Sequence, residues 1–204
     1  MSLCGIRPGH VVLDAATGTG FAAIAASRLA GSTGRVIGID LSTGMLDVAR
    51  MHAGRAGDAP IQWVNGDAAA MSWLDTGTID VVTCAAGLLY MPVQRALDEW
   101  YRVLKPGGTV AFSSMAAGFP VPGRIFRECA GAFGVRLVDP SALLGSEDAC
   151  SAAPEASAFS LTTMTRRRVS FSSQDIGHAW TSNVGSAAHA AVHALGPEVL
   201  EKMQ

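Results

Sequence analysis

The residues best suited to chemistry in this sequence are three aspartates, Asp14, Asp40 and Asp67, each of which follows a short apolar run. The run before Asp14 leads into the segment Ala-Ala-Thr-Gly-Thr-Gly at residues 15–20. A strand that turns through glycines into a helix brings backbone N–H groups close to a ligand at the carboxyl edge of a sheet. The segment therefore predicts a ligand-binding loop, although such turns serve phosphates, dinucleotides and nucleosides alike.

Asp40 and Asp67 narrow the class of ligand. An acidic side chain that ends the strand after a glycine loop accepts hydrogen bonds from ribose hydroxyls, and Asp40 has this place. Asp67 follows the next apolar run, so three adjacent strands would each present a carboxylate to one crevice. Three carboxylates attract a cationic ligand and repel a pyrophosphate. Taken singly, helix capping explains Asp40 and turn formation explains Asp67; together they indicate a ribose-bearing, cationic cofactor.

The elements that must position these residues follow from hydrophobic periodicity. Apolar, β-branched runs alternate with segments of helical period, which predicts an α/β protein. We expect strands at 10–13, 35–39, 61–64, 79–83, 109–113 and 160–171. We expect helices at 21–29, from 42 to about 54, and at 92–104, 124–133 and 147–158, with a helical tail from 173. The predicted fold is a Rossmann-like, doubly wound, mostly parallel sheet with helices on both faces.

Length and composition predict one folded domain. The chain has 204 residues, of which 49% are hydrophobic and 16% charged, and disordered chains are less apolar than this. A typical domain has ~100 to 200 residues, which leaves little room for a second one. We expect a single domain over residues 1–204, in which 1–114 form the cofactor-binding core and 115–204 form substrate-side and C-terminal elements.

Charge and composition argue against several classes of partner. The formal net charge of −2 gives no general attraction to nucleic acid or anionic lipid. No apolar run approaches the ~18 to 20 residues that span a bilayer, and residues 1–9 contain no apolar stretch typical of a secretory signal. The cysteines are far apart and only His189 and His193 have helical spacing, so no metal site is predicted. We expect a cytoplasmic protein without membrane or nucleic-acid partners, and a homodimer is an open option.

Several segments together resemble class I S-adenosylmethionine-dependent methyltransferases. The matching segments, in the family's order and spacing, are 11–20, 37–42, 66–68, 79–82 and 102–108. The Arg-Val-Leu-Lys-Pro-Gly-Gly run at 102–108 is similar to the small-molecule branch that includes ubiquinone and menaquinone biosynthesis enzymes. The resemblance covers about residues 7 to 114 and implies S-adenosyl-L-methionine as cofactor and a small molecule as methyl acceptor.

The resemblance also implies roles at the methionine end of the cofactor. Asp14 would act on the amino group, often through water, and Cys84 would contact the methionine part through its backbone. The backbone of the glycine loop would wrap the same part, at positions Ala16, Thr17, Gly18 and Gly20. Many family members have glycine where this sequence has Ala16.

At the adenosine end, the resemblance implies that Asp40 holds the ribose hydroxyls and that Leu41 packs on the adenine. Asp67, which follows Gly66, would accept from the adenine amino group, and the Ala68 N–H would donate to a ring nitrogen. Residues 88–90 would face the acceptor.

The implied reaction is an in-line displacement at a methyl group that its sulfonium already activates. Orientation of two bound reactants supplies ~7 to 11 kcal/mol of such a barrier. A positioned base adds ~10² to 10⁴-fold where the acceptor must lose a proton. Tyr90, His178 and Cys84 are the candidate bases, and a packing or surface role is the alternative for each.

An NAD(P)-dependent oxidoreductase is the alternative from another class of enzyme. Residues 18–23 fit a loose GxGxxA dinucleotide pattern, and Tyr101 with Lys105 has the spacing of the catalytic pair of short-chain dehydrogenases. Lys105 stands at a helix terminus before Pro106, however, and Asp14 would lie against the cofactor phosphates. Both observations favour a methyltransferase.

Nucleic-acid methylation is the alternative within the family. Three arginines at 166–168 could meet phosphates, but on a strand their side chains would alternate between faces. Residues 83–86 lack the Asn or Asp-Pro-Pro-aromatic run typical of DNA amino-methyltransferases. A small-molecule acceptor is favoured.

A third hypothesis is a cofactor-binding domain without activity. Family members usually carry lid helices before the first strand and a seventh, antiparallel strand near the end. Asp14 comes too early for the lid helices, and no strand is evident after Phe171. The sequence is then either a truncated piece of a longer protein or a naturally shortened member of the family, and in both cases we expect a cofactor site open to water, which weakens desolvation of the reactants.

Overall fold

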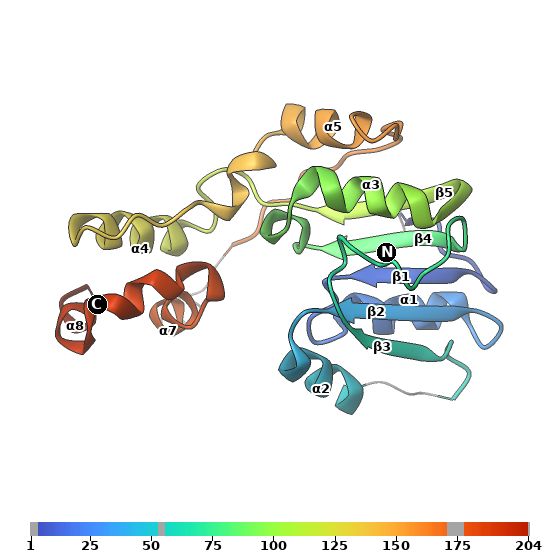
Figure 1. The fold of residues 1–204 in the computed structure, drawn as a ribbon, viewed down its shortest axis with the longest axis horizontal. Coiled ribbons are helices and arrows are strands. Elements are labelled where there is room, and N and C mark those ends of the chain that lie inside the picture. The colour runs from blue at the N-terminus through green and yellow to red at the C-terminus, as the bar shows by residue number, and fades with distance from the viewer. Residues whose placement is uncertain (1–3, 53–55, 171–177, 204) are drawn as a thin grey trace. The chain divides into compact units, whose positions relative to one another are not determined.

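The core of the protein is a five-stranded, all-parallel sheet with strand order β3-β2-β1-β4-β5 (Figure 1). The computed structural model describes residues 4–52, 56–170 and 178–203. The strands are β1 (Val11–Ala15), β2 (Arg35–Asp40), β3 (Ile61–Asn65), β4 (Ile79–Ala85) and β5 (Leu104–Ser113). Since β1 and β4 are neighbours, the strand order reverses beside β1, which places a topological switch point at the carboxyl end of that strand.

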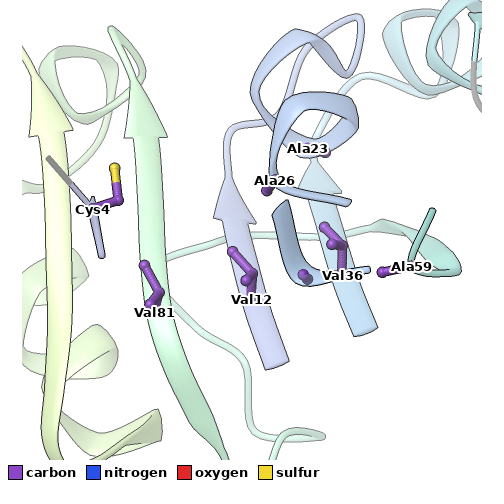
Figure 2. Packing of buried hydrophobic residues seen from close by; sticks show 8 residues of the cluster. Cys4, Val12, Ala23, Ala26, Val36, Ala59 and Val81 are labelled. Carbon is purple, nitrogen blue, oxygen red and sulfur yellow. The ribbon is translucent and has the colours of Figure 1, made fainter. Parts of the chain in front are cut away.

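Helix α1 (Phe21–Ala30) covers one face of this sheet. Its alanines Ala23, Ala26 and Ala30 are fully buried and pack against Val12 and Val36 (Figure 2). Small side chains on the helix let its backbone approach the β-branched sheet surface closely, which is the reason for an alanine-rich helix at this place.

The other face of the sheet is buried as well. Leu13, Ile37 and Ile39 alternate with the α1-facing residues of their strands, and none of them is more than 1% exposed. A strand that is buried on both sides requires helices on both faces. Together with α2 (Thr43–His52) and α3 (Val93–Val103), this arrangement confirms the predicted doubly wound α/β fold.

The Asp80 side chain connects strands at the amino-terminal edge of the sheet, which is opposite the edge predicted to bind the ligand. Its carboxylate accepts hydrogen bonds from the Val11 N–H at 2.8 Å and from Lys105 Nζ at 2.7 Å. Burial opposes ionisation, but the hydrogen bonds from Lys105 and Val11 prevail and hold the pKa of Asp80 below its ordinary value. One side chain therefore joins β1, β4 and β5.

The chain divides into two compact units. The first comprises Met1–Ser114 and Ser151–Thr163, and the second comprises Met115–Cys150 and Met164–Gln204. In the first unit the returning segment lies on α3: Ser157 bonds with Gln94 and with Asp98, the latter at 2.5 Å, and Phe159 meets Tyr101 edge to face at 5.4 Å. A single domain with a substrate-side role for residues 115–204 stays a prediction.

The second unit is helical. Its main elements are α4 (Val121–Ala132), η3 (Pro140–Leu143), the start of α5 (Glu147–Glu155), α7 (Ala179–Val184), η4 (Ala187–Leu195) and α8 (Pro197–Met203). Phe126 and Val192 lie in its core, where the buried His189 ring stacks on Phe126 at 5.1 Å. None of the helices in the described residues is long and apolar enough to span a membrane.

Two predicted elements differ in the structure. The sixth strand predicted at 160–171 is wrong for residues 160–170, which form no helix or strand and are exposed; Phe171 lies outside the described residues. Three consecutive arginines at 166–168 leave no face of that segment that could be buried. Strand β5 begins at Leu104 and not at 109, because Leu104 pairs with Ile79 before the register shifts. Of the predicted helical tail, residues 173–177 lie outside the described part.

Candidate functional site

The glycine loop between β1 and α1 is held tightly against β2. The Thr17 N–H donates to the Ile39 carbonyl at 2.9 Å, and the Gly20 N–H donates to the Thr17 carbonyl at 2.9 Å. Gly20 has φ 83°, and a Cβ there would lie 2.7 Å from the Trp63 ring, so only glycine fits. Ala16 also has a positive φ, 51°. The sequence thus folds a compact turn at the carboxyl end of β1, as predicted.

Asp40 connects this loop to the two neighbouring strand ends. One carboxylate oxygen accepts from the Gly18 N–H at 2.8 Å and the other from the Ser42 N–H at 2.9 Å. The Asp40 carbonyl accepts from the Gly66 N–H at 3.0 Å and from Asn65 Nδ2 at 3.1 Å. The structure therefore brings the predicted residues of the loop, of β2 and of the turn after β3 into one bonded group.

Asp67 presents an accessible carboxylate beside this group. One oxygen closes a tight turn by accepting from the Ala69 N–H at 2.8 Å, while the other lies 4.0 Å from Arg95 Nη2. The Asp67 side chain is 42% exposed. Its neighbour Ala68 is buried and its carbonyl accepts from Trp100 Nε1 at 3.0 Å. Helix α3 thus fixes the turn and leaves the carboxylate toward solvent.

The loop after β4 touches the loop after β1. A Cβ at Gly87 would lie 2.4 Å from the Ala16 Cβ and 3.0 Å from Cys84 Sγ, so the two loops have no room for another atom. Burial raises the pKa of the Cys84 thiol to about 12. A thiol with that pKa stays protonated at neutral pH, and this environment does not suit a general base.

Three large apolar side chains are exposed at this edge. Phe21 is 88% exposed, Leu41 is 74% exposed and Tyr90 is 62% exposed, and they follow β1, β2 and β4 respectively. Apolar side chains gathered beside polar groups are typical of a ligand-binding surface. Phe21 was not predicted as a site residue; the signal in the sequence is an aromatic residue directly after the last glycine of the loop.

Asp14 lies deeper than its predicted role implies. It is 1% exposed, and its two oxygens accept from Thr17 Oγ1 and Thr83 Oγ1, both at 2.6 Å. Burial raises the pKa of Asp14 to about 6, although these hydrogen bonds and one from the Ala23 N–H oppose the rise. Its direct partners are thus groups of the chain itself. Thr83 was missed, because a threonine inside a strand carries no pattern that separates it from sheet packing.

The candidate bases are distributed over both units. Tyr90 lies in η2 (Leu88–Tyr90) of the first unit, as does Cys84 in β4, whereas His178 precedes α7 in the second unit. Within residues 4–52, 56–170 and 178–203, no group of three or more His, Cys, Asp or Glu side chains could hold a metal ion.

Comparison with known proteins identifies the first unit. Residues 12–108 match the family described as "Methyltransferase domain". This segment is a class I methyltransferase domain. S-Adenosyl-L-methionine is the methyl donor of the class, and the segment has groups that suit such a ligand: the partly exposed carboxylates of Asp40 and Asp67 and the exposed apolar side chains of Phe21, Leu41 and Tyr90.

Two curated relatives are similar to the methyltransferase domain. The ubiquinone/menaquinone biosynthesis C-methyltransferase of Hydrogenovibrio crunogenus is 41% identical over 110 residues, which cover 53% of this chain and 43% of the relative. The demethylmenaquinone methyltransferase of Staphylococcus aureus is 43% identical over 107 residues, 52% of this chain and 43% of the relative. The chain therefore spans less than half the length of these relatives.

A solved structure has the same fold over a similar share of the chain. The arsenic(III) S-adenosylmethionine methyltransferase of Chlamydomonas reinhardtii superposes with a TM-score of 0.52 at 30% identity, covering 60% of this chain and 44% of the other. The similarity of sequence and of structure thus centres on the methyltransferase domain.

Proposed function

We propose that the chain binds S-adenosyl-L-methionine at the carboxyl edge of its sheet and transfers the methyl group to a small-molecule acceptor, which leaves S-adenosyl-L-homocysteine. The observation that supports the proposal is the pair of hydrogen bonds at Asp40. Its carboxylate accepts from the Gly18 N–H of the glycine loop, and its carbonyl accepts from the Gly66 N–H in the turn before Asp67. A cytoplasmic location and a homodimer stay predictions.

The residues at the adenosine end have free capacity for a ligand. Each oxygen of an ionised carboxylate has two acceptor sites, so Asp40 can receive ribose hydroxyls while it keeps Gly18 and Ser42. The outer oxygen of Asp67 is available to the adenine amino group, and the exposed side chain of Leu41 offers an apolar surface to the ring.

The residues at the methyl end orient the reactants. When bound, the cofactor supplies a methyl group activated by a positive sulfonium. The backbone of residues 16–20 fixes the position of the methionine part, and η2 with Tyr90 offers a surface for the acceptor. Orientation of this kind accounts for ~7 to 11 kcal/mol of rate enhancement without a dedicated base.

The names of the two curated relatives concern quinones and that of the solved structure concerns arsenic(III), so the acceptor is proposed only as a small molecule. The alternatives of a binding domain without activity and of an oxidoreductase make different predictions. Binding of the cofactor without methyl transfer to any acceptor would indicate the former, and binding of NADH would indicate the latter.

Calorimetric titration of the purified full chain tests the proposal. S-Adenosylmethionine and S-adenosylhomocysteine should bind, and NADH should not. Asp40→Asn should weaken binding at least about tenfold, because it removes the charged acceptor of the ribose. Asp47→Asn, a matched change at an exposed aspartate of α2 that pairs with Arg50, should leave binding unchanged. Wild-type protein that binds neither ligand would overturn the proposal.

A further inference from the structure

A buried hydrogen-bond network links three strands beneath the glycine loop. In the parallel register Asp14 lies opposite Gly38 of β2 and Thr83 of β4, so the three residues share the α1 face of the sheet. Thr83 Oγ1 donates to one Asp14 oxygen and Thr17 Oγ1 donates to the other, each at 2.6 Å. The Ala23 N–H, in the first turn of α1, completes the set of donors.

Thr17 transmits this network to the loop. Its N–H is fixed by the Ile39 carbonyl at 2.9 Å, and its hydroxyl reaches down to Asp14. The position opposite must be small, since a Cβ at Gly38 would lie 3.1 Å from Thr17 Oγ1 and 2.6 Å from the Trp63 ring. The hydrogen bond from Thr17 to the buried Asp14 carboxylate therefore fixes the loop that precedes α1.

Among residues 4–52, 56–170 and 178–203, the hydrogen-bond partners of this carboxylate are two hydroxyls and one backbone N–H, none of which is charged. The titratable side chains that interact electrostatically with Asp14 are Asp40 at the end of β2, Cys84 in β4 and Cys4 before β1, all of which are acids. Burial dominates over the three hydrogen bonds and raises the pKa of Asp14 to about 6. At neutral pH a buried negative charge, bonded only to neutral groups of the described residues, thus lies next to the loop.

We propose that Thr17 and Thr83 are positioning residues of the cofactor loop, which act through the buried Asp14 carboxylate and so make binding of the cationic cofactor depend on pH. The inference rests on the proposed function. A cation that favours ionised Asp14 must, by linkage, bind more tightly when Asp14 is ionised. Cofactor affinity should therefore fall as the pH falls through about 6, and binding near that pH should release protons.

Two readouts on the full chain test the network. The first is the dissociation constant of S-adenosylmethionine between about pH 5 and about pH 8, with proton release measured in buffers of different ionisation enthalpy. Wild-type protein should bind about fivefold more weakly at about pH 5 than at about pH 8, which corresponds to a one-unit lowering of the Asp14 pKa on binding. Asp14→Asn should abolish this pH dependence.

The second readout needs no cofactor: the titration of the Asp14 carboxyl carbon, followed by NMR. Thr83→Val removes one donor to the ionised form and should move the midpoint to higher pH, with the affinity curve moving in the same direction. Thr83→Ser keeps the hydroxyl and should restore both. Thr78→Val, which removes a hydroxyl that donates to the Asp75 carbonyl just before β4, is the matched control and should change neither.

The outcomes separate the network from the proposed function. If Thr83→Val weakens binding equally at every pH and leaves the Asp14 midpoint in place, Thr83 only packs the strand and the inference is wrong. If wild-type protein binds neither S-adenosylmethionine nor S-adenosylhomocysteine at any pH, the proposed function is wrong. The NMR titration of Asp14 still tests the network in that case. If Thr83→Val does not move the titration midpoint, the network is wrong as well. If Thr83→Val moves the midpoint, Thr83 remains a positioning residue of the loop.

Discussion

At the scale of single residues, the tightest contact at the site joins Ala16 to Gly87. Ala16 has a left-handed backbone, with φ 51°, where glycine has no penalty and alanine costs about 1 kcal/mol. Gly87 has φ −91° and ψ −33°, which any residue adopts. The space between the loops, and not the backbone of Gly87, therefore excludes a side chain at position 87.

This contact predicts a double-mutant cycle. Gly87→Ala should lower the free energy of unfolding by about 1–3 kcal/mol, since the new methyl group would overlap the Ala16 Cβ. Ala16→Gly alone should be neutral or should stabilise by up to about 1 kcal/mol. The double variant should recover part of the loss, with a coupling of at least about 0.5 kcal/mol in urea unfolding. Strict additivity would contradict the contact.

Asp14 predicts an unusual dependence of stability on pH. Its pKa in the folded protein, about 6, is above the ordinary value of 3.8, so the folded state binds its proton more tightly than the unfolded state does. This contribution to stability is present below about pH 4 and is lost as the pH rises through about 6. The effect of Asp14→Asn on the free energy of unfolding should therefore be more stabilising at pH 8 than at pH 4, by about 1–3 kcal/mol.

The control for Asp14 is Asp47→Asn, at an exposed surface pair, which should change the free energy of unfolding by under about 0.5 kcal/mol at both pH values. Denaturant unfolding at several pH values measures both. An Asp14→Asn variant that changes the free energy of unfolding equally at pH 4 and at pH 8 would contradict the raised pKa of the buried carboxyl.

At the scale of elements, α3 organises the turn that carries Asp67. Arg102 donates to the carbonyls of Met71 at 3.0 Å and Leu74 at 2.9 Å, and it pairs with Glu99 at 2.7 Å. Glu99 in turn accepts from the Met71 N–H. A helix that lies on the sheet thus supplies the hydrogen bonds that a long connection between β3 and β4 cannot form with itself.

Arg102→Lys should loosen this connection. A lysine keeps the charge but cannot reach two carbonyls and a carboxylate in the planar geometry of a guanidinium. We expect a loss of about 1–3 kcal/mol in the free energy of unfolding and faster amide exchange at residues 68–74. Arg124→Lys, in the exposed pair with Glu128 on α4, should cost under about 0.5 kcal/mol. Unchanged exchange at 68–74 would refute this role of α3.

The sequence was most informative where one pattern decides one element. Strands β1 to β4 and helices α1 to α3 lie where periodicity predicted them, because each has a clear apolar period. The Lys-Pro-Gly-Gly run at 105–108 predicts the end of the helix at 92–104, because Pro-Gly-Gly usually ends an element, yet Leu104 already pairs with Ile79 of β4 before an irregularity in the register. The location of Asp40 and Asp67 at one edge followed from strand order, whereas Thr83 depends on the pairing of β1 with β4, which connects segments about 70 residues apart.

At the scale of the whole molecule, the methyltransferase domain is not completed by a continuous stretch of chain. Residues 151–163 return to the first unit after the excursion through 115–150, and Ser157 and Phe159 lie against α3. The contacts are an aromatic pair, which contributes about 1 kcal/mol, and a hydrogen bond that Ser157 donates to the Asp98 carboxylate.

Phe159→Ala should therefore lower the free energy of unfolding of the first unit by about 1–3 kcal/mol and reduce amide protection in α3. Leu161→Ala, two residues further along and about half exposed, is the matched control and should have little effect. Hydrogen exchange resolves α3 from the second unit, so the measurement is specific. Equal protection of α3 in both variants would contradict the attachment of this segment.

The return of residues 151–163 to α3 also has a consequence for synthesis on the ribosome. The strands that end at Ser113 leave the exit tunnel first, but the outer side of α3 stays uncovered until the chain has been extended past Phe159. Protein chains fold from the N-terminus as they emerge, and for this one the cofactor edge is formed before the segment that covers α3. A nascent chain arrested between the two events would carry the ligand-binding residues on a domain in which α3 is still uncovered. At this stage, binding of a chaperone or of the cofactor would stabilise the chain most.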